Sequence, residues 1–147
     1  MVESSGCSMH LERACVYPKL GLVLVDRAVR NCGVLEFPAS TRARKAAQTC
    51  AKIALASRSP VRFGSGWIGV DAASCSVVVR DANGQLWAIQ HSYDVSVELG
   101  EKLFVGRCSG VTFPAADATS WENFDVTGCT FDQAGYDRVA ASLGWAH

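Results

Sequence analysis

Residues 74–93 have the sequence Ser-Cys-Ser-Val-Val-Val-Arg-Asp-Ala-Asn-Gly-Gln-Leu-Trp-Ala-Ile-Gln-His-Ser-Tyr. Within this stretch, Val77–Val79 form the short β-branched run of a strand that is buried on both faces, and Leu86–Ile89 form the run of a returning strand. The four residues Asp81–Gly84 fit a type I turn in which the aspartate caps the turn and the glycine takes a positive-φ bulge position. The stretch therefore predicts a β-hairpin, which is a signal of the scaffold and does not by itself indicate a function.

Upstream of the hairpin, the sequence from about residue 41 to residue 57 has the pattern of an amphipathic helix. Ser40 or the threonine after it can act as the N-cap, and small apolar residues recur at helical spacing on one face. Three cations, Arg42, Arg44 and Lys45, crowd the N-terminal turns, where the helix dipole disfavours positive charge. One interpretation is a solvated face. The other is that these three residues meet an anion or an acidic partner.

A second helix is predicted at about 132–143, before Gly144. Strands are predicted near 20–25, 33–37, 66–70, 75–80, 85–92, 94–99, 103–108 and 124–126. Because the strands follow one another in runs, we expect an α+β fold, in which two principal helices pack on a mainly antiparallel sheet of about seven or eight strands. The whole chain, 1–147, is expected to be one domain with an irregular N-terminal segment, 1–19.

The charges of the chain are balanced, with 14 Lys and Arg residues against 14 Asp and Glu residues. No basic surplus exists to neutralise phosphates, so we expect no nucleic-acid partner. Residues 64–69 match G-x-G-x-x-G, but a strand rather than a helix follows them, which favours a glycine-rich strand over a nucleotide site. No apolar run approaches the ~20 residues that cross a bilayer, and the N-terminus lacks the apolar core of a signal peptide. We therefore expect no membrane partner.

Cysteine usage gives the expected location of the protein. The chain has seven cysteines, an odd number, without a Cys-x-x-Cys pair, and a domain of this size does not depend on disulfides. We predict buried free thiols that act as small apolar side chains in a reducing cytoplasm.

One group of residues suggests a cysteine-dependent enzyme. Cys108 lies in Gly-Arg-Cys-Ser-Gly (106–110), which has the form of a nucleophile elbow, although an extended segment replaces the helix that should follow it. His91 is the candidate base and Asp94 the candidate orienting acid, because a triad is defined by geometry rather than by order in the chain. Cys75 is a second candidate nucleophile, since it is expected to lie across the hairpin from His91. The alternative is that both cysteines are core residues.

Four residues near the N-terminus suggest a zinc site. Cys7, His10, Cys15 and Cys32 supply four ligands of the types that zinc prefers, and such a site would hold an irregular segment in place. Their spacing includes one Cys-x-x-His and two isolated cysteines, without a second paired knuckle. We therefore expect no cofactor, and a zinc-stabilised module is kept as an alternative.

The favoured hypothesis is a non-enzymatic binding or interaction protein that uses an open sheet face or a loop pocket for a small molecule or a protein partner. Trp121 lies in a polar loop and is the tryptophan expected at such a surface. Homodimerisation through a strand edge or the sheet face is a further hypothesis, because unpaired edges must be covered or blocked. The alternatives are the cysteine-dependent enzyme and the zinc-stabilised module described above.

Overall fold

The structure is a computed structural model that describes residues 20–25, 29–94, 100–118 and 122–145. These residues form two α-helices, a short 3-10 helix and eight strands, six of them in one mainly antiparallel sheet, so the predicted α+β class is confirmed. In chain order the elements are η1 (Leu22–Leu24), β1 (Arg30–Phe37), α2 (Thr41–Ala56), β2 (Val61–Ile68), β3 (Ala72–Arg80), β4 (Leu86–Asp94), β5 (Glu101–Cys108), β6 (Gly110–Thr112), β7 (Asp125–Thr127), β8 (Thr130–Phe131) and α3 (Gln133–Ser142).

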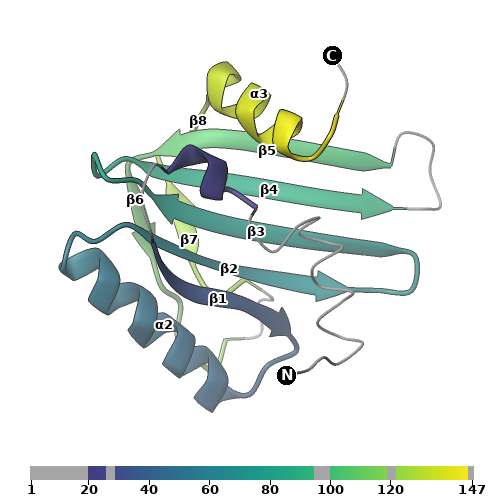
Figure 1. Cartoon of the computed structure of the whole chain (residues 1–147). Helices are drawn as coiled ribbons and strands as arrows, with labels where there is room; N and C mark the ends of the chain where they lie inside the picture. The colour runs from purple at the N-terminus through teal and green to yellow at the C-terminus, as the bar shows by residue number, and fades with distance from the viewer. Residues whose placement is uncertain (1–19, 26–28, 95–99, 119–121, 146–147) are drawn as a thin grey trace, which may run out of the picture.

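The main sheet has the strand order β1-β2-β3-β4-β5-β8 (Figure 1). β1 and β2 pair in parallel, and α2 makes the crossover between them, as a parallel pair requires. Every other neighbouring pair in this sheet is antiparallel. β6 and β7 form a separate two-stranded sheet, which lies behind the main sheet in Figure 1.

The predicted hairpin is β3 and β4, and its turn has the predicted form. The carboxylate of Asp81 accepts two backbone N–H groups of the turn, both at 2.9 Å, and Gly84 has a φ of +85°. The register places Cys75 directly opposite His91. The local sequence therefore determines this hairpin, because an Asx-type turn and a glycine bulge set its register.

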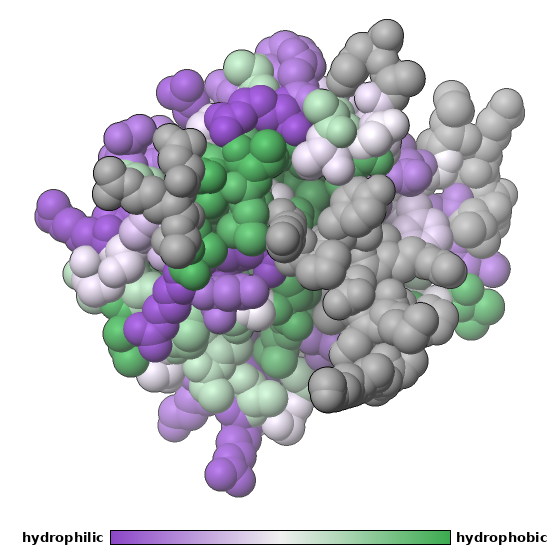
Figure 2. All heavy atoms as spheres, in the orientation of Figure 1, coloured by the Kyte–Doolittle hydropathy of each residue, from purple (hydrophilic) through white to green (hydrophobic). Residues whose placement is uncertain are grey.

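Other elements pack on both faces of the main sheet. α3 and η1 lie on one face, over a core that includes Val77, Ile89 and Val139 (Figure 1). The space-filling view shows apolar residues near the centre of that face and hydrophilic residues around them (Figure 2). α2 covers part of the other face, over a second core that includes Phe63 and Phe124.

The two principal helices lie where the sequence predicts them and begin at side-chain caps. The Ser40 hydroxyl accepts the N–H of Ala43 at 3.0 Å, and the Asp132 carboxylate accepts the N–H of Gly135 at 2.7 Å. α3 ends before Gly144, which has a φ of +77°, so the predicted C-terminal glycine is also confirmed. No helix of the described residues is long and apolar enough to cross a membrane.

The structure corrects two local predictions. In place of the predicted strand at 20–25, residues 22–24 form a 3-10 helix, and Gly21 precedes it with a φ of +86°, outside the extended region of a regular strand. A Cβ on Gly21 would lie 2.8 Å from a Val79 methyl group, so the chain packs closely on the sheet at this glycine. The strand predicted near 33–37 begins earlier, at Arg30, and contains an irregularity where the pairing with β2 shifts between Asn31 and Val34.

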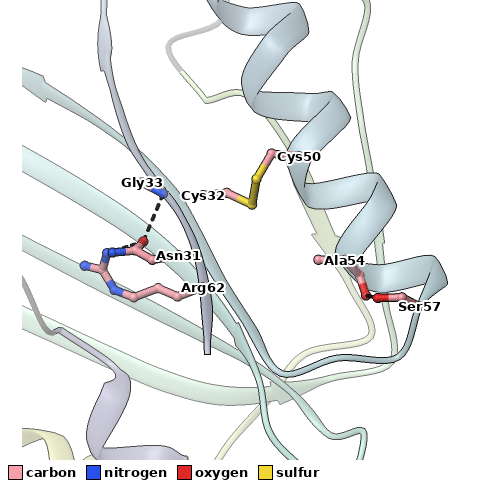
Figure 3. The surroundings of a disulfide bond; sticks show 7 residues. All are labelled: Asn31, Cys32, Gly33, Cys50, Ala54, Ser57 and Arg62. Carbon is pink, nitrogen blue, oxygen red and sulfur yellow. Dashed lines mark hydrogen bonds between the residues drawn. A yellow bond between two sulfur atoms is a disulfide. The ribbon is translucent and has the colours of Figure 1, made fainter. Parts of the chain in front are cut away.

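The prediction of buried free thiols is wrong for the five cysteines that the structure describes. Cys32 forms a disulfide with Cys50, which joins β1 to α2 (Figure 3), and Cys108 forms one with Cys129. Cys75 is disulfide-bonded as well. The pairs are 18 and 21 residues apart in the chain, yet their Cα atoms lie 5.8 and 4.0 Å apart. Only the tertiary fold brings these residues together, so their spacing in the sequence did not reveal the bonds.

Candidate ligand-binding pocket

The catalytic group predicted around Cys108 does not assemble. Cys108 is in a disulfide, so its sulfur carries no thiolate to act as a nucleophile. It pairs with Leu86 on the α2 side of the sheet, whereas His91 lies on the opposite face. Asp94 is three residues from His91 on the same strand, and an odd separation in a strand also places the two side chains on opposite faces.

Cys75 and His91 are cross-strand neighbours, as the hairpin predicts, but the pair has no thiol in this structure because Cys75 is disulfide-bonded. The His91 ring is 1% exposed, and its Nε2 lies 3.0 Å from a carboxylate oxygen of Glu101. Its centroid is 6.3 Å from that of Trp145. These contacts hold His91 as a buried structural residue between the sheet and the chain end that follows α3.

The predicted zinc ligands are not assembled within the described residues. Cys32 is bonded to Cys50 and has no thiolate for a metal. Cys7, His10 and Cys15 lie outside the described residues, as does the predicted surface residue Trp121. In the part of the chain that the structure describes, no three His, Cys, Asp or Glu side chains form a metal-binding group.

The three cations of α2 that the sequence offered as partner-binding residues separate into two kinds. Arg42 and Lys45 are exposed, as a partner-binding role requires. Arg44 is only 3% exposed, and its guanidinium donates to the backbone carbonyl of Glu122 at 3.4 Å. The prediction that Arg44 belongs to a surface site is therefore wrong, because this side chain faces the segment that follows β6.

A buried polar network that the sequence analysis missed holds that segment. The Gln48 amide donates to the Pro114 carbonyl at 2.8 Å and to the Asn123 side chain at 3.0 Å. The Asn123 backbone N–H donates to the Ser65 hydroxyl at 2.9 Å. The pKa of the adjacent Glu122 is raised overall. Burial raises it most, a hydrogen bond with Ser76 lowers it, and the charge of Asp125 raises it. These contacts satisfy buried polar groups, so we interpret the network as an anchor.

On the α2 side of the main sheet, a row of side chains crosses the strands. The strand registers align five of them, which are Phe37, Trp67, Ser74, Ser92 and Lys102. Phe37 and Lys102 are exposed and the other three are half-buried. The row lies on the same sheet face as α2, and the use of an open sheet face for binding stays a prediction.

A pocket of about 630 Å³ lies at the turn between β3 and β4, on the sheet face covered by α3. The hairpin turn forms one wall, and η1, β5 and α3 contribute the others. The lining residues are Leu24, Asp81, Ala82, Asn83, Gly84, Gln85, Trp87, Arg107 and Arg138. The pocket therefore combines the locally determined turn with residues brought to it by the tertiary fold.

Hydrogen bonds and stacking fix the charged side chains of this pocket. Asp81 uses its second carboxylate oxygen to accept the indole N–H of Trp87 at 3.1 Å. The Arg107 guanidinium carbon lies 5.4 Å from the centroid of the Trp87 ring, and its Nε lies 3.3 Å from Asp132. Arg138 donates a hydrogen bond to the carbonyl of Val23. Each arginine is thus oriented by the protein before any ligand arrives.

The electrostatics of the lining favour an anion. The lining contains two guanidinium groups and one carboxylate, and the carboxylate of Asp81 accepts three hydrogen bonds from the hairpin itself. A guanidinium has five N–H donors, so pairing of Arg107 through Nε leaves its terminal amino groups as further donors. The Arg107 side chain is 57% exposed, which leaves it accessible from solvent.

Sequence reasoning placed no site residue at this pocket, although the turn itself was predicted. Arg107 was noted only as part of the segment around Cys108, and Arg138 lies within a helix that carried no site prediction. Charged residues spaced this far apart give no local signal, so the pocket was visible only in the fold. Comparisons with protein-family models, with curated proteins and with solved structures yield no match.

Proposed function

We propose that this protein is a non-enzymatic binding domain, stabilised by disulfides, that holds a small molecule through an anionic group in the pocket at the β3–β4 turn. The observation that carries the proposal is that Arg107 and Arg138 line one cavity, each fixed by contacts with the protein. Planar guanidinium groups match carboxylate, phosphate and sulfate oxygens. A loop pocket was one of the two surfaces expected from the sequence.

The rigidity of the pocket supports a binding role. Trp87 is only 7% exposed and forms the floor beneath Arg107, so both side chains are already ordered in the unbound protein. Each flexible side chain that binding would otherwise immobilise costs about 0.5–1.5 kcal/mol. A ligand that meets an ordered arginine avoids much of that cost.

The chemistry of the lining also favours binding over catalysis. Among the described residues that surround the pocket, none is a cysteine, histidine, serine, threonine or tyrosine. The only titratable acid there, Asp81, is occupied as a hydrogen-bond acceptor within the turn. These groups can orient an anion, but they include no evident nucleophile with an adjacent base.

We propose an oxidising compartment outside the cytoplasm as the place where the protein works. The cytoplasmic location predicted from the sequence depended on free thiols, and the five cysteines that the structure describes are all disulfide-bonded. Disulfides persist in secreted and periplasmic proteins and are reduced in the cytosol.

Titrations with simple anions test the binding site. Inorganic phosphate, sulfate and acetate should each perturb the backbone amide resonances of residues 81–85 and the side-chain Nε resonance of Arg107. The Arg107→Gln variant should lose these perturbations. Arg30→Gln is the matched control, because Arg30 is exposed and does not line the pocket.

The relative strength of the three probes distinguishes the anionic groups. Tighter binding of acetate indicates a carboxylate ligand, and tighter binding of phosphate or sulfate indicates a tetrahedral anion. Perturbations that follow exposed charges over the whole surface, and that persist in Arg107→Gln, would show that the pocket is not a specific anion site.

A further inference from the structure

The outward side of α2 carries a line of positive charge. Arg42, Lys45 and Lys52 are three, seven and ten residues apart, spacings that place them on one side of a helix. All three are exposed, and α2 contains no acidic residue. Within the part of the chain that the structure describes, none of the three makes an ion pair, although the Lys52 ammonium lies 5.4 Å from the centroid of the Phe113 ring. In a protein of balanced charge, this side of the helix is therefore locally basic.

The placement of two of these cations, Arg42 and Lys45, works against the stability of the helix. Arg42 and Lys45 lie in the first turns of α2, beside the positive end of the helix dipole, and the first turn contains no acid to offset them. Negative charge supplied from outside the chain would be favoured by both the side chains and the dipole. The exposed face of α2 is thus electrostatically complementary to an acidic surface.

Apolar side chains lie among the cations. Ile53 is 50% exposed, and Ala46 and Ala56 are exposed on the same side of the helix. An apolar centre with a charged border is typical of protein–protein interfaces. A nucleic acid would instead be expected to engage a larger number of phosphate-binding cations. The combination favours a protein partner.

The helix is held as a rigid platform from behind. The Cys32–Cys50 disulfide joins α2 to β1 (Figure 3), and the buried Gln48 side chain donates to the segment behind the helix. Because these contacts lie away from the exposed face, docking would not disturb them. A rigid surface loses less conformational entropy on binding than a mobile one.

We propose that the α2 basic face, defined here as Arg42, Lys45, Lys52, Ala46 and Ile53, docks an acidic surface of another protein. This site is separate from the pocket, since the pocket lies on the other face of the main sheet. The proposal therefore stands or fails independently of anion binding in the pocket.

A designed peptide tests this inference on the full chain with its disulfides intact. The probe is an amphipathic helical peptide with glutamates on one side and leucines on the other. We expect chemical-shift changes on α2, and binding that weakens as salt is added. Lys45→Glu should weaken binding at least tenfold. Lys102→Glu is the matched control, because Lys102 is an exposed lysine of β5, away from α2, and should bind as the wild type does.

Further probes keep the inference falsifiable. Ile53→Ser should also weaken peptide binding, while a peptide with lysines in place of the glutamates should not bind. If Lys45→Glu and Lys102→Glu lost equal affinity for the peptide, binding would depend only on the overall charge of the protein, and the inference would be overturned. Binding of single-stranded DNA or anionic lipid vesicles at α2, without binding of the acidic peptide, would overturn the assignment of a protein partner.

Discussion

Trp87 and Arg107 face each other across β4 and β5, with the guanidinium carbon of Arg107 5.4 Å from the centroid of the Trp87 ring. Asp81 holds the Trp87 indole from the turn, and Asp132 holds Arg107 from the start of α3. One chain of contacts therefore runs from the hairpin turn to the helix. The pocket depends on this series of contacts, so substitutions at its different residues should change the stability of the protein by different amounts.

Asp81→Asn should destabilise the protein by about 1–3 kcal/mol, because a buried or half-buried hydrogen-bonding group would lose its partner. The asparagine amide can accept at only one oxygen, whereas Asp81 accepts from two backbone N–H groups and from the Trp87 indole. Urea unfolding measures the change. Asp117→Asn, at an exposed position, should alter stability little. Equal effects of the two substitutions would contradict the capping role of Asp81.

The ion pair between Arg107 and Asp132 should contribute little to stability. Arg107 is 57% exposed, and exposed pairs typically contribute about 0.2–1 kcal/mol. A double-mutant cycle with Arg107→Ala and Asp132→Ala measures their coupling energy. Asp132→Ala alone should cost more than the coupling, because Asp132 also caps α3 through Gly135. A coupling above about 2 kcal/mol would mean that this pair is more than an orienting contact.

Loss of the Cys32–Cys50 disulfide should lower stability by about 2–4 kcal/mol, since the bond restricts the unfolded chain across a separation of 18 residues. The double variant Cys32→Ser/Cys50→Ser is compared with wild type by denaturant unfolding without reductant. The corresponding variant of Cys108 and Cys129, which are 21 residues apart, provides a matched comparison and should lose a similar amount. Thiol titration of the unreduced, denatured protein should find these four cysteines unreactive. Four reactive thiols would restore the prediction made from the sequence.

Glu122 should make stability fall as the pH rises from its ordinary pKa of 4.5 toward its raised folded-state pKa. In that interval the folded protein binds more protons at this site than the unfolded chain does, so raising the pH favours unfolding. Glu122→Gln should remove this part of the pH dependence. Its stability relative to wild type should therefore be higher at neutral pH than at acidic pH.

Unfolding free energies of wild type and Glu122→Gln, measured across that range, test the expectation. The contributions of other titrating groups largely cancel in the difference between the two curves. Parallel curves would show that the folded-state pKa of Glu122 is not raised.

The local sequence determined the elements that depend on nearest neighbours. The turn at Asp81–Gly84 and the cap at Ser40 arise from side chains that bond to backbone groups a few residues away, so their positions could be read from the sequence. The α+β class followed from the succession of strands and two helices, for the same reason. The predicted strand at 20–25 failed because Gly21 adopts a conformation set by close packing on the sheet.

Only the tertiary structure decided which distant side chains meet. It paired cysteines 18 and 21 residues apart, buried Arg44 while leaving Arg42 exposed, and brought Arg107 and Arg138 to one pocket. It also placed His91 on the opposite side of the sheet from Cys108, so the predicted catalytic group does not assemble. The physical reason is the same in each case. Contacts between distant residues depend on strand order, on the face of the sheet and on helix crossovers, and these depend on the burial of the whole chain rather than on any single segment.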